Sequence, residues 1–192
     1  MAAAAVMLCD IGEVERVLIF DLDVHQGDGT ATILKNEGRV FTASVHCADQ
    51  QFPAKKARSD LDVEIPAGTG DDAYLAVIAK ILPETIRSFQ PQLVLYDAGV
   101  DTHKCDRLGR LSLSDEGLAR REMLVLDTCV GYGIPTAAVV GGGYDDSIDE
   151  LAARHEHLHR AAAEVFHSAG LTFDEDDFRA FHNPIAEEEN FC

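Results

Sequence analysis

The chain has 192 residues, of which 46% are hydrophobic and 26% charged, as is typical of a globular protein with one sizeable core. Its formal net charge of −18 repels phosphates, so we expect no direct nucleic-acid partner, whereas cationic peptides or amines suit it. The apolar run at 2–8 is too short to cross a bilayer and lacks the flanks of a signal peptide, which argues against a membrane partner.

Strands and helices are expected to alternate along the chain, with no internal repeat or linker. Apolar runs and helical periodicity predict strands over 17–21, 40–45, 62–65, 92–96 and 135–140, and helices over 2–11, 30–36, 73–88, 114–131 and 146–168. Pro83 is expected to kink or shorten the third helix, because proline lacks an amide hydrogen. The alternation predicts a parallel sheet in a three-layer α/β/α arrangement with right-handed crossovers.

Two further features concern the ends of the chain and its compartment. Residues 1–170 are expected to form the domain, and residues 171–192, which are rich in Asp and Glu, an acidic C-terminal tail. The five cysteines are scattered without a C-x-x-C pair, which favours a reduced intracellular compartment. Nucleus, cytoplasm and an organelle all fit this expectation.

The first predicted strand runs directly into acids, an imidazole and two glycines. Side chains alternate along an extended chain, so Asp21, Asp23 and His25 are expected to point to one side, where they suggest a metal site. Gly27 and Gly29 allow a tight turn and a close approach to a ligand. The alternative is an Asp- and Gly-rich turn with a solvated histidine, and this spacing alone does not separate the two interpretations.

Two other strands also end in polar or glycine-rich turns, at 97–101 and at 141–144. Because the carboxyl ends of parallel strands meet at one edge of a sheet, Asp23, His25 and Asp101 are expected to form a three-ligand site. Three protein ligands leave a position open for water or substrate, as in catalytic zinc sites. Tyr144, which follows three glycines, is a candidate hydroxyl donor to a developing oxyanion, or else a tyrosine packed beside a loop.

These motifs resemble those of the zinc-dependent histone deacetylases, a family of the arginase/deacetylase superfamily. The resemblance rests on three ordered segments and covers roughly residues 1–165: Asp21-x-Asp23-x-His25-x-Gly27-x-Gly29-Thr30, Asp97-Ala98-Gly99-x-Asp101 continuing to Leu113, and Gly141-Gly142-Gly143-Tyr144-Asp145. Within the family, the details most resemble the class IV branch. The resemblance implies a mainly parallel, doubly wound sheet.

The resemblance also implies a role for each matching residue. Asp23, His25 and Asp101 match the ligands of one zinc ion, and Tyr144 matches the tyrosine that polarises the amide carbonyl. Asp21, Ser44 and the Val45 backbone match a potassium site. Residues of the acyl-lysine channel match Phe52, Gly142 and Gly143. The implied substrates are an acyl-lysine protein or peptide, such as a histone tail, or an acylated polyamine.

The chain departs from the family pattern in one respect. Deacetylases of this family carry a His-His pair upstream of the first motif, and one of its imidazoles acts as general base. None of the eight histidines here is adjacent to another, and twenty residues precede Asp21. We therefore expect a partial, N-terminally truncated deacetylase domain that lacks the first strands of the sheet and has impaired activity. His46 and His103 are candidate replacement bases, although a supporting role near the site is favoured.

Three alternatives to an acyl-lysine deacetylase stay open. An acetylpolyamine amidohydrolase would use the same ligands. A binuclear manganese ureohydrolase would need additional carboxylates, and Gly27 stands where one is expected. A non-catalytic interaction module of the same fold is favoured by the missing histidine pair and opposed by the intact ligands and Tyr144.

Overall fold

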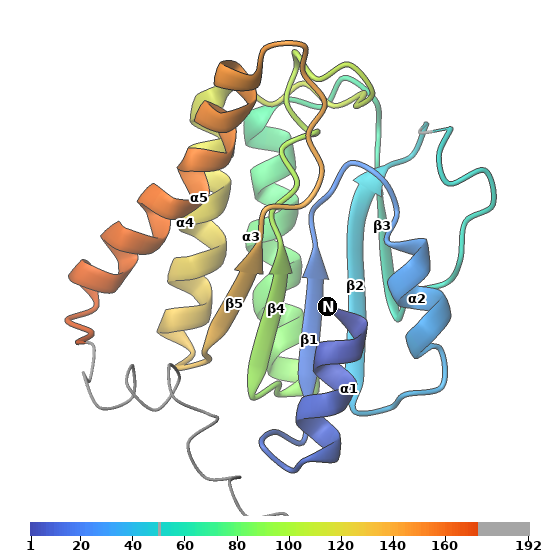
Figure 1. Ribbon diagram of the computed structural model, residues 1–192, viewed down its shortest axis with the longest axis vertical. Helices are drawn as coiled ribbons and strands as arrows, with labels where there is room; N and C mark the ends of the chain where they lie inside the picture. The colour runs from blue at the N-terminus through green and yellow to red at the C-terminus, as the bar shows by residue number, and fades with distance from the viewer. Residues whose placement is uncertain (50, 173–192) are drawn as a thin grey trace, which may run out of the picture.

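The computed structural model describes residues 1–49 and 51–172 and contains one five-stranded parallel sheet. The strand order is β3-β2-β1-β4-β5, and every pair of neighbours is parallel. In chain order the strands are β1 (Val17–Asp21), β2 (Val40–Cys47), β3 (Leu61–Ile65), β4 (Leu93–Asp97) and β5 (Thr136–Val139). All five arrowheads point the same way in Figure 1, so the carboxyl ends share one edge of the sheet.

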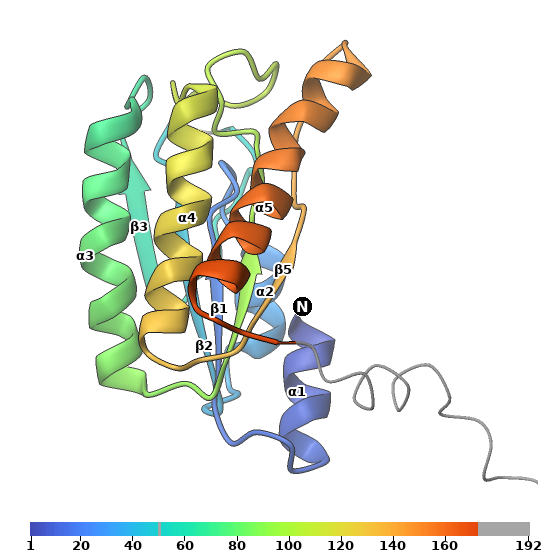
Figure 2. The same cartoon turned by 90° about the vertical axis from the view of Figure 1, so that its left-hand side faces the viewer.

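Helices cover both faces of the sheet and complete the three layers. One face carries α1 (Ala2–Asp10) and α2 (Asp28–Leu34), and the other carries α3 (Asp71–Phe89), α4 (Asp115–Gly131) and α5 (Ile148–Ser168). Figure 2 shows the sheet between these two sets of helices. The predicted α/β/α arrangement is therefore confirmed.

The alternation of side chains along β1 divides the hydrophobic core into two parts. Leu18 and Phe20 pack into the larger cluster, between the sheet and α3, α4 and α5. Val17 and Ile19 point the other way, into a smaller cluster that includes Ala5 of α1. All four β1 side chains are at most 1% exposed, which is the burial expected of a central parallel strand.

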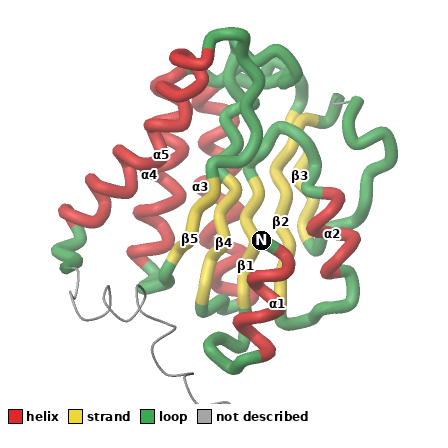
Figure 3. The backbone as a smooth tube through the Cα atoms, in the orientation of Figure 1, coloured by secondary structure: helices red, strands yellow, loops and turns green. Residues whose placement is uncertain are grey.

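The sheet changes its winding direction between β1 and β4. From β1 the chain proceeds outward through β2 to β3, then returns to the other side of β1 and proceeds through β4 to β5. The sheet is thus doubly wound, as the family resemblance implies, and its switch point, where such sheets bind ligands, lies between β1 and β4. Figure 3 shows the long loops gathered at this edge.

Pro83 does not shorten its helix, because α3 continues for 19 residues from Asp71 to Phe89, and the alternative expectation of a kink stays a prediction. The ring forfeits only one backbone hydrogen bond, while Ile78, Leu82 and Ile86 keep the helix packed on the sheet. Within the described residues, no helix is both long and apolar enough to cross a membrane. The expected acidic tail at 171–192 lies outside the described residues from position 173 onward.

Candidate metal centre

Asp23, His25 and Asp101 converge beyond the carboxyl ends of β1 and β4. One potential ligand atom from each residue lies within 4.8 Å of the other two. The His25 Nδ1 is 2.9 Å from Asp23 Oδ1 and 3.1 Å from Asp101 Oδ2. Asp101 is fully buried, and its Oδ1 accepts a hydrogen bond of 2.8 Å from the amide of Val24, which ties the two loops together. The expected three-ligand cluster therefore forms.

The side chain of Asp21 does not join this cluster, because β1 ends at that residue. Asp21 Oδ1 accepts a hydrogen bond of 3.0 Å from the amide of Asp23, and the chain then bends instead of continuing as a strand. Its other oxygen faces Gly27, where an added Cβ would lie only 2.3 Å from it. The extended-chain prediction is thus wrong for Asp21, although Asp23 and His25 still meet.

The glycine segment after β5 lies against the same carboxylates. The amide of Gly142 donates a hydrogen bond of 3.0 Å to Asp23 Oδ2. A Cβ at this position would lie 2.4 Å from Asp23 Oδ2 and 2.6 Å from Asp101 Oδ2. A Cβ on Gly143 would instead meet Val100, Leu151 and His155. The chain therefore needs a residue without a Cβ at position 142 for its backbone to close the side of the cluster.

Negative charge is concentrated at this point of the molecule. Hydrogen bonds that the His25 imidazole donates to Asp101 and Asp23 raise the pKa of His25 to about 10. Burial, together with the neighbouring Asp97 and Asp23 carboxylates, raises the pKa of Asp21 well above its usual value. A proton on His25 thus lies between two carboxylates where a bound cation would also be favourable, because cations reverse the repulsion among such groups.

The donor set suits zinc, a metal that the sequence resemblance implies. One imidazole and two carboxylates from three different positions are ordinary zinc ligands, and three of them leave a coordination position open. The Asp101 carboxylate is oriented by the Val24 amide. The residues present therefore fit this group.

Tyr144 lies beside the cluster, with its ring centroid 6.2 Å from that of His25 and its plane at 88° to the imidazole. Burial, followed by the negative charges of Asp23 and Asp101, raises the pKa of the Tyr144 hydroxyl, which keeps it protonated near neutral pH. Tyr144 therefore remains a hydrogen-bond donor there.

Asp106, which lies in the second motif but received no predicted role, accepts a hydrogen bond from the backbone of Tyr144. Its Oδ2 accepts a hydrogen bond of 2.7 Å from the Tyr144 amide. Its Oδ1 accepts hydrogen bonds from the amides of Leu108, at 2.8 Å, and Gly109, at 2.7 Å. The signal available in the sequence is an Asp just before a glycine-containing turn, where a carboxylate often bonds to nearby amides. The hydrogen bond from the Tyr144 amide, 38 positions away, has no sequence signal.

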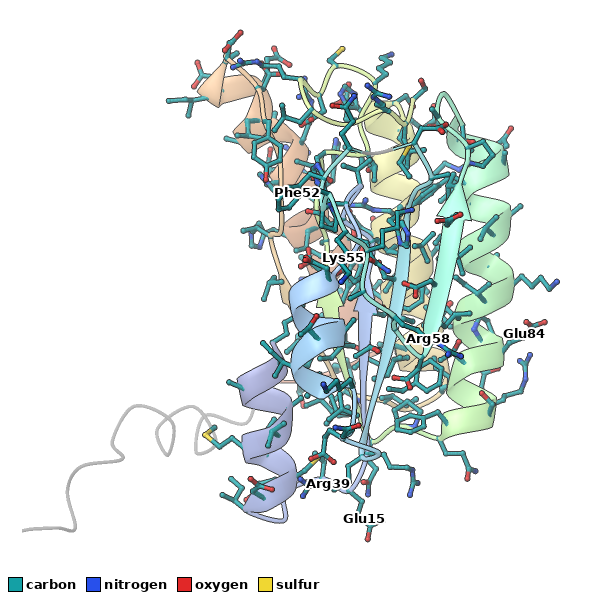
Figure 4. The ribbon with its side chains drawn as sticks, turned by 90° about the vertical axis from the view of Figure 1, so that its right-hand side faces the viewer. Glu15, Arg39, Phe52, Lys55, Arg58 and Glu84 are labelled. Atoms are coloured by element: carbon teal, nitrogen blue, oxygen red, sulfur yellow. The ribbon has the colours of Figure 1, made fainter. Side chains whose placement is uncertain are left out.

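Phe52 lies on the other side of His25. The two ring centroids are 5.8 Å apart in an edge-to-face arrangement, and Phe52 is 66% exposed. Figure 4 shows Phe52 on a loop that also carries Lys55 and Arg58. The imidazole of His25 is thus flanked by two aromatic rings, Phe52 and Tyr144.

The three residues matched to a potassium site are found on β1 and β2. Asp21 pairs with Ser44 in the parallel register, and Val45 follows in the core. The Ser44 hydroxyl accepts a hydrogen bond of 3.3 Å from the amide of Gly27. Asp21, Gly27 and Ser44 line a cavity of about 10 Å³, and the potassium site that the resemblance implies stays a prediction.

Neither candidate replacement base reaches solvent. His46 is fully buried, with its Nδ1 3.0 Å from Ser44 Oγ, and His103 is 2% exposed, with its Nε2 3.6 Å from Asp115. The Nδ1 of His103 accepts a hydrogen bond from the Cys105 amide. Both imidazoles therefore fit the supporting role that the sequence favours over proton transfer to a substrate.

Comparisons with known proteins agree with this geometry. Residues 1–161 match the family described as the histone deacetylase domain. The chain is 53% identical over 155 residues to an uncharacterized protein of Picosynechococcus sp., a match that covers 81% of this chain and 51% of that protein. It is 36% identical over 142 residues to histone deacetylase 2 of Arabidopsis thaliana, covering 73% of this chain and 37% of that protein.

The fold is also found among solved structures. An acetylpolyamine aminohydrolase from Burkholderia pseudomallei superposes with a TM-score of 0.68 at 23% sequence identity, covering 83% of this chain and 48% of that one. The chain thus spans about half or less of the length of the relatives that it matches. The class IV assignment stays a prediction. Because the domain match extends over residues 1–161, the chain belongs to the histone deacetylase family.

Proposed function

We propose that the chain carries the metal centre of a deacetylase-type amidohydrolase, which removes acyl groups from lysine side chains or from acylated polyamines. The observation that supports this most is the convergence of Asp23, His25 and Asp101 at the switch point of the sheet, with Tyr144 beside them. Relatives described as a histone deacetylase and a probable deacetylase support the same class of reaction.

Asp23, His25 and Asp101 are proposed to hold one zinc ion. When bound at such a site, zinc acts as a Lewis acid toward an amide carbonyl. The protein fixes the ligands through the Val24 amide on Asp101 and the Gly142 amide on Asp23. In the same proposal, Asp21, Ser44 and the Val45 backbone hold a potassium ion that steadies the turn before Asp23.

Tyr144 is proposed to donate its hydroxyl hydrogen bond to the oxyanion that develops from the substrate carbonyl. A hydrogen-bond donor that is already in position lowers the activation barrier, because its hydrogen bond strengthens as negative charge develops on the carbonyl oxygen. Loss of one such donor typically lowers the rate by about 10²–10³-fold. Phe52, Gly142 and Gly143 are proposed to line the channel for the acyl-lysine stem. The formal net charge of −18 favours approach of a cationic substrate.

Proton transfer is the weak part of this centre in these 192 residues. The His25 imidazole is a proposed ligand, and His46 and His103 are buried against protein groups. General acid–base assistance typically contributes about 10²–10⁴-fold, so we expect slow turnover by these residues alone. The interaction-module alternative shares this expectation of low activity, and zinc binding separates the two.

The test is to incubate the purified 192-residue chain with one equivalent of zinc and measure both binding and deacylation. An acetyl-lysine peptide and an acetylated polyamine serve as substrates, with Asp101→Ala as the matched control. We expect zinc binding that requires Asp101, together with slow deacylation that Asp101→Ala and Tyr144→Phe abolish. Zinc binding equal in wild type and Asp101→Ala would contradict the proposal and favour the interaction module.

A further inference from the structure

An arginine and a glutamate of α4 are buried together beneath the candidate metal centre. Arg121 is fully buried and Glu122 is 1% exposed. The guanidinium donates to Glu122 Oε1 through Nε at 3.1 Å and Nη2 at 2.5 Å, and the hydroxyl of Tyr96 donates to Glu122 Oε2 at 2.5 Å. Its charge is therefore compensated within the core, which is the usual condition for burying an arginine.

The remaining donors of Arg121 go to the ends of two different strands. Nη1 donates to the Gly99 carbonyl at 2.8 Å and to the Leu22 carbonyl at 3.5 Å, and Nη2 donates to the Ala98 carbonyl at 3.3 Å. Leu22 follows β1, whereas Ala98 and Gly99 follow β4. One side chain thus links the two loops that leave the switch point.

These contacts lie immediately beside the proposed zinc ligands. Leu22 directly precedes Asp23, and Thr102 directly follows Asp101. The Thr102 hydroxyl accepts a hydrogen bond of 3.0 Å from Arg121 Nη1. Both loops are further joined by the Leu22 amide, which donates to the Asp97 carbonyl at 3.1 Å. A shift of Arg121 would therefore change the separation of the two carboxylates.

We propose that Arg121 is a positioning residue for the metal centre, which sets the separation of Asp23 and Asp101 through the backbone carbonyls on either side of the switch point. This inference rests on the proposed zinc function. Stability alone does not explain the arginine, because a buried ion pair is often no more stabilising than well-packed apolar residues. A planar guanidinium with five donors, in contrast, can contact Glu122 and both loops at the same time.

The sequence position supports a specific role. Arg121 and Glu122 lie three and four residues after Leu118, and Val125 follows at the next turn, so both charges interrupt the apolar face of α4. Charged side chains are seldom fully buried unless they are paired. The face would pack more simply with two apolar residues, which would lack donors for the loop carbonyls.

The test is the zinc affinity of Arg121→Lys in the full 192-residue chain, measured by competition with a chromophoric chelator. Lysine keeps the charge beside Glu122 but cannot donate to both loops, so we expect zinc affinity to fall about 10–100-fold, the usual cost of losing a group that orients ligands. Val125→Ala is the matched control, because it destabilises the same face of α4 without removing a hydrogen bond. It should lower the thermal midpoint of the zinc-free chain while leaving the zinc affinity unchanged.

Thr102→Val provides a second variant should Arg121→Lys fail to fold. It removes one acceptor of the guanidinium with little change in shape, and we expect weaker zinc binding that is not additive with Arg121→Lys. Unchanged zinc affinity in whichever of these two variants folds would overturn the positioning role and leave the proposed function intact. Wild-type binding no tighter than that of Asp101→Ala would instead overturn the proposed function, and the positioning role with it.

Discussion

Gly142 shows how closely the backbone approaches the carboxylates of the site. Its amide donates to Asp23 Oδ2, and a methyl group at its Cα would lie 2.4 Å and 2.6 Å from oxygens of Asp23 and Asp101. We expect Gly142→Ala to push these oxygens apart and to weaken zinc binding by about 10–100-fold. Zinc titration against a chelator measures the effect.

Gly29 provides the matched control for that substitution. It lies in α2, close in sequence to Asp23 and His25, and nothing lies within 4 Å of the Cβ that an alanine would add. Gly29→Ala is expected to leave zinc affinity unchanged and to stabilise the helix by about 0.5–1 kcal/mol. Equal zinc affinities for the two alanine variants would contradict the argument from close approach.

Asp106 carries a second prediction for a single residue. Its carboxylate accepts hydrogen bonds from three amides, including that of Tyr144, and it is 9% exposed. In Asp106→Asn at least one of these amides loses its acceptor, so we expect the free energy of unfolding to fall by about 1–3 kcal/mol. Urea unfolding measures this change.

Asp146 is the control for Asp106. It also contacts a residue of the same loop, Arg107, but its side chain is 84% exposed. Ion pairs at the surface contribute about 0–1 kcal/mol, so Asp146→Asn is expected to have a small effect. A loss in Asp106→Asn no larger than that in Asp146→Asn would show that the three amide contacts do not stabilise the loop.

The first helix is held to the sheet at the end remote from the site. Arg39, just before β2, donates hydrogen bonds to Asp10 of α1, at 2.9 Å, and to Glu37, at 2.7 Å. Figure 4 shows Arg39 near α1, at the opposite end of the molecule from Phe52. Hydrogen bonds from Arg39 lower the pKa of Glu37 to about 2, from an ordinary value of 4.5.

The sign of the resulting pH dependence follows from this lowered pKa. A carboxyl group with a lower pKa in the folded chain stabilises it above pH 4.5, and that contribution is lost as the pH falls toward about 2. We expect the difference in unfolding free energy between wild type and Glu37→Gln to shrink over this range, as measured by urea unfolding at several pH values. High salt should reduce the difference at pH 6, because both groups are partly exposed to solvent and therefore screened. A difference that stays constant with pH would contradict the assignment.

The positions of the elements could be predicted well from the sequence because burial imposes clear patterns. The fully apolar run of β1 and the periodic faces of α3 and α4 are found where they are expected. Pro83 does not shorten α3, since the local rule for proline does not include the packing that holds this helix in place. Element boundaries shift by at most two residues, as the start of α2 at Asp28 instead of residue 30 shows.

The two edges of the sheet differ at the scale of the whole molecule. Along the outer strand β3, the exposed charged residues Asp62 and Glu64 alternate with apolar residues. These charges discourage pairing with another chain. At the other edge, β5 pairs only with β4 among the described residues, and Val139 and Val140 are 42% and 48% exposed. Figure 1 shows β5 at the end of the sheet.

We therefore expect the 192-residue chain to self-associate through β5 as its concentration rises. Val139→Lys should reduce this association, because a charge on an edge strand opposes strand pairing. Ile33→Lys, on α2 and at a residue that is 69% exposed, makes the same change of charge away from this edge and should not. Sedimentation velocity measures the effect, and equal association of wild type and Val139→Lys would contradict it.

The candidate site was predictable only in part. Asp23, His25 and Asp101 could be placed together because the carboxyl ends of parallel strands meet at one edge. The contacts of Asp106 with the Tyr144 amide and of Arg121 with the loop carbonyls join residues 22–99 positions apart, and no local pattern specifies them. Such contacts depend on the final path of the backbone, which sequence motifs do not describe.

The candidate metal-binding side chains lie between the two windings of the sheet, and this position has a consequence for folding. Asp23 and His25 belong to the half built from β1, β2 and β3, whereas Asp101 belongs to the half built from β4 and β5. An ion held by all three residues would cross-link these halves, and partial opening along the β1–β4 boundary would release it. Zinc should therefore slow hydrogen exchange most at the Leu22 and Val24 amides, whose hydrogen bonds cross that boundary. The ion would then stabilise the folded domain in addition to its proposed part in the reaction.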